Sequence, residues 1–145
     1  MSSDWVTLTA DWQGDMAFIG KNKSGGSVHM GKVENKPGVS PMELLLAGLA
    51  GCTGVDIVHI LRKKRISLHD FRVSVRAKRA DDHPKVYTEI EINYVFWGQD
   101  LLNKDVEQAI QLSEEKYCSA SAMLGATAKI SSSYRILTPS LTEED

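Results

Sequence analysis

The longest apolar segment of the chain lies between residues 41 and 64. Leucine, valine and isoleucine occur on nearly every face of it, at positions 44, 45, 46, 49, 55, 57, 58, 60 and 61. Ser40, Pro41 and Glu43 open the segment in the order of a capping box. We therefore predict a helix to about Lys64 that must be covered on every side. One small sheet cannot surround such a helix, so we expect it to be buried against a second copy of the chain.

Alternation of apolar and polar residues predicts strands on both sides of this helix. Three short strands are expected before it, a hairpin after it and one strand near the end, at residues 5–10, 16–20, 28–30, 71–77, 88–96 and 128–136. In the hairpin, pairing Val75 with Ile90 would match the apolar faces. It would also place Arg76 opposite Glu89, which is a favourable charge pair.

Residues 103–117 predict a second helix with an apolar stripe that includes Val106 and Ser113. Asn103 is expected to cap this helix, and Ser119 to cap a further short one. The resulting order is β-β-β-α-β-β-α-β. It predicts an α+β fold in which antiparallel sheets pack against the central helix.

Composition restricts the class of protein. A length of 145 residues favours a single domain over residues 1–145, with a frayed acidic tail over residues 138–145. A net charge of −2 gives no field that would attract nucleic acid or a membrane surface. The N-terminus lacks the pattern of a signal peptide. We also expect residues 44–60, which contain three glycines and an aspartate, to be too short and too polar to span a bilayer. These features predict a cytoplasmic protein.

The two cysteines, Cys52 and Cys118, lie 66 positions apart. In a reducing compartment they are expected to be free thiols or a transient redox pair. Gly51 and Gly54 flank Cys52 inside the helix, where each costs about 1 kcal/mol relative to alanine. These glycines indicate either that a substrate or a second helix approaches closely at Cys52, or that the helix is simply packed tightly there. Cys118 follows Lys116 between two helical segments, so it is either a thiol of lowered pKa or a buried linker residue.

Other polar residues near the cysteines suggest weaker alternatives. Asp56 and His59 follow Cys52 on roughly one helical face, but His59 is about 10 Å along the axis. A carboxylate beside a thiol would also raise the thiol pKa. A metal site would need both cysteines with His59 or His29, and no pair has ligand-like spacing. We therefore expect neither a metal nor another cofactor.

Two segments of the chain resemble the OsmC and Ohr hydroperoxide reductases. Residues 40–52, SPMELLLAGLAGC, are similar to the first cysteine segment of that superfamily, and residues 115–124, EKYCSASAML, to the second. The Ser-Pro-Met-Glu start and the Lys-Tyr-Cys-Ser segment are most similar to the YhfA-like branch. Both segments together are specific, and the resemblance extends over nearly the whole chain.

The resemblance implies an intertwined homodimer with sheets wrapped around two long central helices. It also implies a peroxidase in oxidative-stress defence that needs neither metal nor flavin. By position, Cys52 would attack the peroxide and become a sulfenic acid, and Cys118 would condense with it to a disulfide. A small-molecule or protein dithiol would then reduce the pair. The apolar residues around Cys52 favour organic hydroperoxides as substrates.

The chain departs from the family pattern at the residues that would activate Cys52. Met42 stands where the well-studied reductases have a glutamate, and Glu43 comes one residue later, about 100° around the helix. Glu43 is thus the carboxylate available for a catalytic role, although nine residues separate it from Cys52 and capping alone suits its geometry better. Lys32 falls where the family arginine is expected, with Lys21 as another candidate, and lysine lacks the bidentate fork. Ser119 stands where those reductases usually have a proline.

Because of these departures, two alternatives to the peroxidase stay open: a dimer that binds an apolar small molecule, and a purely structural dimer.

Overall fold

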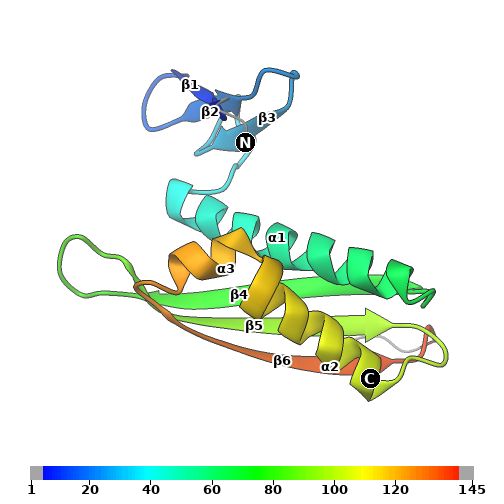
Figure 1. Cartoon of the computed structure of the whole chain (residues 1–145). Coiled ribbons are helices and arrows are strands. Elements are labelled where there is room, and N and C mark those ends of the chain that lie inside the picture. Colours follow the sequence, from blue (N-terminus) through cyan, green and yellow to red (C-terminus); the bar gives the residue numbers. More distant parts are fainter. Residues whose placement is uncertain (1–4, 141–145) are drawn as a thin grey trace. The chain divides into compact units, whose positions relative to one another are not determined.

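The computed structural model describes residues 5–140, and the elements follow in the predicted order with one π-helical turn added (Figure 1). They are β1 Thr9–Trp12, β2 Phe18–Lys21, β3 Ser27–Met30, α1 Pro41–Lys63, β4 Asp70–Arg79, β5 Tyr87–Trp97, α2 Asn103–Leu112, the π-helical turn η1 Ser113–Tyr117, α3 Ser119–Leu124 and β6 Lys129–Leu137. Most of the expected acidic tail lies outside the described residues. Contacts divide the chain into two compact units, with the boundary inside α1 between Leu45 and Leu46.

The first unit contains a three-stranded antiparallel sheet in the order β1-β2-β3. It ends with the start of α1, where the predicted capping box is confirmed. The Ser40 N–H donates to Glu43 Oε1 at 2.8 Å, and the Glu43 N–H donates to Ser40 Oγ at 3.1 Å. Two of the N–H groups at the helix start are therefore satisfied locally.

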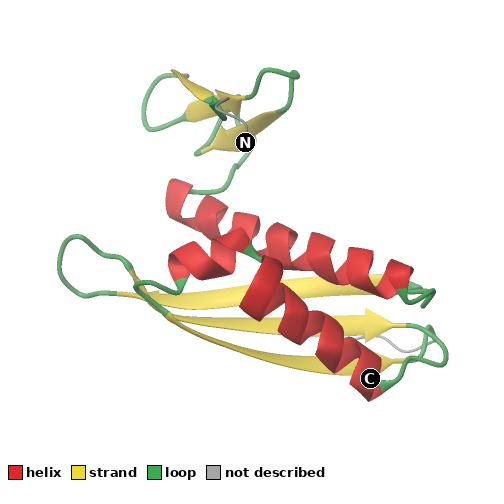
Figure 2. Ribbon diagram, in the orientation of Figure 1, coloured by secondary structure: helices red, strands yellow, loops and turns green. Residues whose placement is uncertain are grey.

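The second unit contains a sheet in the order β4-β5-β6, with α1 from Leu46 onward and α2 on the same face (Figures 1 and 2). β4 and β5 are antiparallel, but β5 and β6 are parallel. The expectation of purely antiparallel sheets was therefore wrong for this unit. The parallel pairing of β5 and β6 results from the connection between them. This connection runs through α2, η1 and α3, and such a crossover returns the chain to the end of the sheet where β5 began.

The hairpin register differs by two residues from the predicted one. Val75 pairs with Ile92 instead of Ile90, and Arg76 pairs with Glu91 instead of the glutamate two positions earlier. A shift of two residues leaves every side chain on its own face, so the apolar pattern fits both registers. In the observed register Arg76 Nε lies 2.5 Å from Glu91 Oε2.

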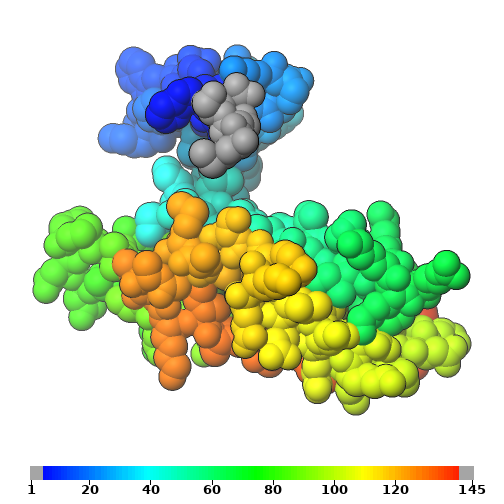
Figure 3. Space-filling view, viewed as in Figure 1, coloured from blue at the N-terminus to red at the C-terminus, as the bar shows by residue number. Residues whose placement is uncertain are grey.

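The core of the second unit lies between the two helices and the sheet. Its buried apolar side chains are Leu49, Ile57 and Leu61 of α1, Ile90, Ile92, Tyr94 and Phe96 of β5, and Val106, Ala109 and Ile110 of α2. Figure 3 shows residues 103–124 packed beside α1 on one face of the second unit.

The predicted Asn103 cap of α2 was wrong, because Leu102 holds the N-cap position and makes no side-chain hydrogen bond there. Asn103 Oδ1 instead accepts a hydrogen bond from Tyr134.

Within the described part of the second unit, one face of α1 is left uncovered. Val55 is 70% exposed, and a Cβ at Gly48 or Gly51 would meet no atom within 4 Å. Gly54 instead packs against Val73, since a Cβ at Gly54 would lie at ordinary van der Waals distance from that side chain.

α1 runs unbroken for 23 residues, and an 18-residue stretch of it has a mean hydropathy of 1.9. By length and composition, such a helix could cross a membrane. The expectation that this segment is too short and too polar was therefore wrong, because the glycines and Asp56 do not interrupt the helix. A core helix of a soluble protein meets the same criterion.

Candidate functional site

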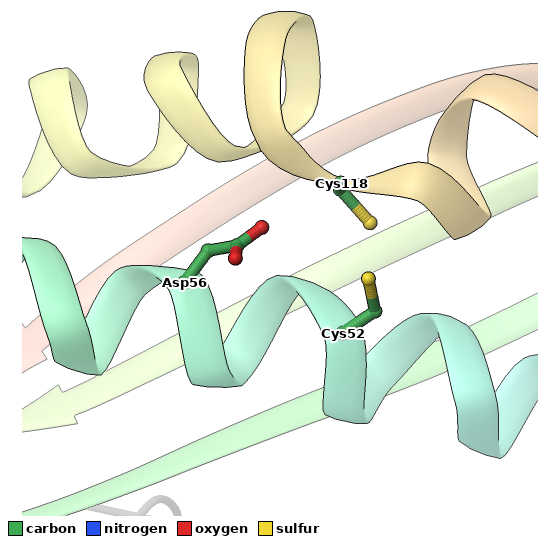
Figure 4. A group of neighbouring side chains, drawn as sticks. All are labelled: Cys52, Asp56 and Cys118. Carbon is green, nitrogen blue, oxygen red and sulfur yellow. The ribbon is translucent and has the colours of Figure 1, made fainter. Parts of the chain in front are cut away.

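Cys52 and Cys118 meet in the second unit, across the gap between α1 and the end of η1. Their sulfur atoms and a carboxylate oxygen of Asp56 all lie within 4.8 Å of one another. Figure 4 shows the two thiols pointing toward each other, with Asp56 one turn along α1 from Cys52. Both cysteines are free. A disulfide between them would require the sulfurs to approach to about 2 Å.

The π-helical turn η1 positions Cys118. The Cys118 N–H donates to the Ser113 carbonyl at 2.7 Å, which is a bond between residues five apart. Cys118 is then the cap of α3, where its Sγ accepts a hydrogen bond from the Ser121 N–H at 3.3 Å. The prediction that Ser119 caps this helix was therefore wrong by one residue. The thiol takes the place that a serine or aspartate side chain usually occupies.

The two thiols differ in their surroundings. Cys52 is half-buried, whereas Cys118 is 4% exposed. Burial raises the pKa of Cys118; the hydrogen bonds from Ser121 oppose this shift, and the neighbouring Cys52 adds to it. The lowered pKa considered for Cys118 on account of Lys116 is therefore wrong. Lys116 Nζ lies instead 5.2 Å from the ring centre of Tyr117.

Ser113 connects Asp56 to the turn that carries Cys118. The serine is fully buried, and its Oγ donates to Asp56 Oδ2 at 3.1 Å. The same Oγ lies 3.5 Å from the Thr53 carbonyl of α1. Sequence reasoning placed Ser113 on the apolar stripe of the second helix but missed this role. The available signal was a single hydroxyl among apolar positions, since a buried hydroxyl needs a hydrogen-bond partner.

Tyr94 and Glu114 attach the turn to the sheet. The hydroxyl of Tyr94, on β5, donates to Glu114 Oε2 at 2.5 Å, and Ser132 Oγ, on β6, donates to Glu114 Oε1 at 3.1 Å. The pKa of Tyr94 is raised, mainly by burial and secondly by the hydrogen bond to the Glu114 carboxylate and its negative charge. The glutamate therefore holds η1 against two neighbouring strands, and this attachment fixes the height of Cys118 above the sheet.

The same group of side chains is the one that could hold a metal. Thiolates and carboxylates are both ligands of zinc, and Cys52, Asp56 and Cys118 offer one ligand atom each. Among the described residues, this group contains no histidine, so His59 and His29 do not take the places considered for them. Cys118 is far from Cys52 and Asp56 in the sequence, but the fold brings the three ligand atoms together.

A pocket lies beside Asp56, between α1 and the segment of α2 and η1. Its volume is about 480 Å³, and it is lined by Asp56, His59, Ile60, Lys63, Lys64, Leu112 and Tyr117. Lys64 is bonded there to Asp105 at 3.2 Å and to Gln108. The pocket combines apolar walls with cationic groups, and Asp56 belongs both to this lining and to the group with the two thiols.

The remaining candidate residues belong to the first unit. Glu43 is exposed, and the hydrogen bonds from the Ser40 backbone and side chain lower its pKa. Lys21 lies 3.9 Å from Asp11, and Lys32 is exposed. The structure thus assigns Glu43 a capping role, and its role beside Cys52 stays a prediction, as does that of either lysine.

Comparison with known proteins gives a consistent set of relatives. The family described as OsmC-like protein matches residues 33–133. Protein YhfA of Escherichia coli K12 is 33% identical over 126 residues, which cover 87% of this chain and 94% of that protein. Among solved structures, a hypothetical protein from Aquifex aeolicus VF5 is 36% identical with a TM-score of 0.83, covering 93% of this chain and 98% of the other. The organic hydroperoxide resistance protein OhrB of Bacillus subtilis shares the fold at 18% identity and a TM-score of 0.61, with 92% of this chain and 100% of the other covered.

Proposed function

The chain belongs to the OsmC-like family, and from this premise we propose that it is a thiol-dependent peroxidase that reduces organic hydroperoxides in oxidative-stress defence. The observation that carries the proposal is the proximity of two free thiols from segments far apart in the sequence, with sulfur atoms within 4.8 Å of each other. Family and thiol pair together support a redox role.

The different burial of the thiols supports their order of reaction. Cys52 is the more accessible and is proposed to attack the peroxide as a thiolate, forming a sulfenic acid and releasing an alcohol. Cys118, which is buried, then condenses with it to a disulfide and releases water. A small-molecule or protein dithiol reduces the disulfide by exchange and restores both thiols. Glu43 is the carboxylate proposed to assist Cys52, as the one nearest in sequence to the family glutamate.

The substrate class and the assembly follow from apolar surface. The apolar side chains of α1 near Cys52, of which Val55 is exposed, favour bulky organic hydroperoxides over hydrogen peroxide. The uncovered face of α1, with Val55 exposed and Gly51 open, supports a homodimer in which two such helices approach closely. This assembly would also cover the helix without a membrane. We propose accordingly that the protein acts as a cytoplasmic dimer.

A peroxide-consumption assay tests the proposal. The reduced protein is mixed with cumene hydroperoxide and dithiothreitol, and the remaining peroxide is measured over time, with hydrogen peroxide as the comparison substrate. We expect turnover that favours cumene hydroperoxide and is abolished in Cys52→Ser. Cys118→Ser protein, mixed with the peroxide after dithiothreitol has been removed, is expected to consume one equivalent and to stop as a sulfenic acid. Full turnover by Cys52→Ser protein would contradict the proposal.

A second candidate function is binding of an apolar small molecule without catalysis. The pocket of about 480 Å³ beside Asp56 favours it, because its volume suits a small ligand and its walls include Ile60, Leu112 and Tyr117. Lys63 at the same pocket would suit a negatively charged end of that ligand. A molecule that copurifies with the wild-type protein, and is lost in Leu112→Glu, would favour this function if peroxide is not consumed.

A further inference from the structure

The thiol pair has a third member, the Asp56 carboxylate, for which neither thiol oxidation nor capping gives a reason. One of its oxygens lies within 4.8 Å of both sulfur atoms. We propose that Asp56 is the proton carrier for the step in which Cys118 condenses with oxidised Cys52. The proposal rests on the proposed peroxidase function and assigns a residue to its second step.

The condensation requires two proton movements. After the peroxide has reacted, Cys52 carries a sulfenic acid and Cys118 is still a thiol. When the Cys118 sulfur attacks the Cys52 sulfur, the S–S bond forms from the electron pair of Cys118, and the S–O bond breaks with its pair on oxygen. The thiol proton passes to the Asp56 carboxylate, and Asp56 passes a proton to the departing hydroxide, which leaves as water. The carboxylate is regenerated, and no further oxidant or reductant is needed.

Cys118 needs such a base because its environment keeps it protonated. The residue is 4% exposed, and burial raises the pKa of its thiol. A neutral thiol is a poor nucleophile, since the thiolate is the attacking species. A carboxylate close to the sulfur can accept the proton as the new bond forms, directly or through one water molecule. A carboxylate oxygen within 4.8 Å of both sulfurs can thus serve the buried thiol and the leaving oxygen in one step.

The structure holds Asp56 in this position through a residue that also holds Cys118. Ser113 Oγ donates to Asp56 Oδ2 at 3.1 Å, and this hydrogen bond orients the carboxylate. The Ser113 carbonyl accepts the Cys118 N–H at 2.7 Å. Because one buried serine bonds to both groups, the base and the attacking thiol are placed relative to each other by a single anchor.

Several cationic side chains lie near Asp56, at the pocket beside it. His59 and Lys63 line the pocket beside it, and Lys64 is bonded to Asp105 and Gln108 at the same pocket. Within residues 5–140, none of these cations forms an ion pair with Asp56. Its one polar side-chain partner in this group is the neutral Ser113 hydroxyl.

The test separates the two chemical steps in a single turnover. Reduced protein is mixed with one equivalent of cumene hydroperoxide. Sulfenic acid is trapped with dimedone at successive times, and the disulfide is measured by mass spectrometry. In Asp56→Asn we expect sulfenic acid to form within about twofold of the wild-type rate and the disulfide to form at least about tenfold more slowly. Glu115→Gln, which removes the same charge from η1 away from the thiols, is expected to behave as wild type.

Several outcomes would overturn the proposal. Disulfide formation at the wild-type rate in folded Asp56→Asn protein contradicts it, and so does equal slowing by Glu115→Gln. If Asp56→Asn does not fold, disulfide formation in the wild-type protein is compared in water and deuterium oxide, and an unchanged rate contradicts proton transfer in that step. If wild-type protein forms no sulfenic acid, both the peroxidase and the proton carrier are wrong. Sulfenic acid that condenses without Asp56 contradicts the carrier alone.

Discussion

The buried hydroxyl of Ser113 donates a hydrogen bond to Asp56 Oδ2 at 3.1 Å, and so joins the turn η1 to the helix α1. The two residues are 57 positions apart in the chain. The backbone carbonyl of the same serine also accepts the N–H of Cys118. A serine that no sequence motif singled out therefore links the Asp56 carboxylate to the residue that carries the buried thiol.

Removal of this hydroxyl should destabilise the fold. Ser113→Ala leaves the Asp56 carboxylate without its donor in a partly buried site, so we expect a loss of about 1–3 kcal/mol in the free energy of unfolding. Urea unfolding followed by circular dichroism measures it. The matched control is Ser133→Ala, because that serine is exposed and its hydroxyl donates to Asn93 Oδ1 near the surface. Equal stability of the two variants would show that the Ser113 bond contributes nothing beyond a surface contact.

The two thiols should differ in reactivity toward an alkylating agent. Reduced protein treated with iodoacetamide near neutral pH is expected to be modified at Cys52 first, because Cys118 is buried and its pKa is raised. The rate at Cys118 should continue to increase above the ordinary thiol pKa of about 8.5. Peptide mass spectrometry at successive times follows both sites. Faster modification of Cys118 would contradict the proposed assignment, in which Cys52 attacks the peroxide and Cys118 forms the disulfide with it.

Stability should decrease in alkaline solution. Burial raises the folded-state pKa of both Cys118 and Tyr94, so folding favours their neutral forms. This contribution is complete below the unfolded-state pKa values, about 8.5 for a thiol and 10 for a phenol, and is lost as the pH rises through and beyond them. The melting temperature is expected to decrease above pH 8.5 and more steeply above pH 10, and Tyr94→Phe should flatten the second decrease. A constant melting temperature from pH 7 to pH 11 would contradict this linkage.

Two substitutions separate the capping role of Glu43 from its proposed catalytic role. Ser40→Ala removes the hydroxyl that accepts the Glu43 N–H, and should cost about 1 kcal/mol of stability. Glu43→Gln keeps the capping box, because glutamine also suits that position, so its melting temperature should stay near that of the wild type. If Glu43 assists Cys52, peroxide turnover in Glu43→Gln should fall by at least about tenfold. Unchanged turnover would leave capping as its role.

The uncovered face of α1 should control the oligomeric state. Val55→Glu places a charge where Val55 is 70% exposed in the single chain. We expect the wild type to sediment as a dimer, and this variant to dissociate or to lose stability. Lys104→Glu, a charge change at an exposed position of α2, is the control and should remain a dimer. A monomeric wild-type protein would contradict the proposed assembly.

The sequence by itself determined the elements and their faces. The capping box of Ser40 and Glu43 predicted the start of α1, because its two hydrogen bonds join residues three apart and need no tertiary contact. Alternation along residues 71–77 and 88–96 predicted the buried face of the hairpin for a similar local reason. The cysteine segments also led to the family and to the expected thiol pair.

Only the tertiary structure decided how these elements combine. The hairpin register moved by two residues because the apolar pattern repeats with that period, and β6 became parallel to β5 because of the crossover before it. The group of Cys52, Asp56 and Cys118 depends on a π-helical turn, whose extra residue rotates Cys118 toward α1. No local pattern predicted that turn, since its geometry depends on bonds that Tyr94 and Asp56 make to it from other elements.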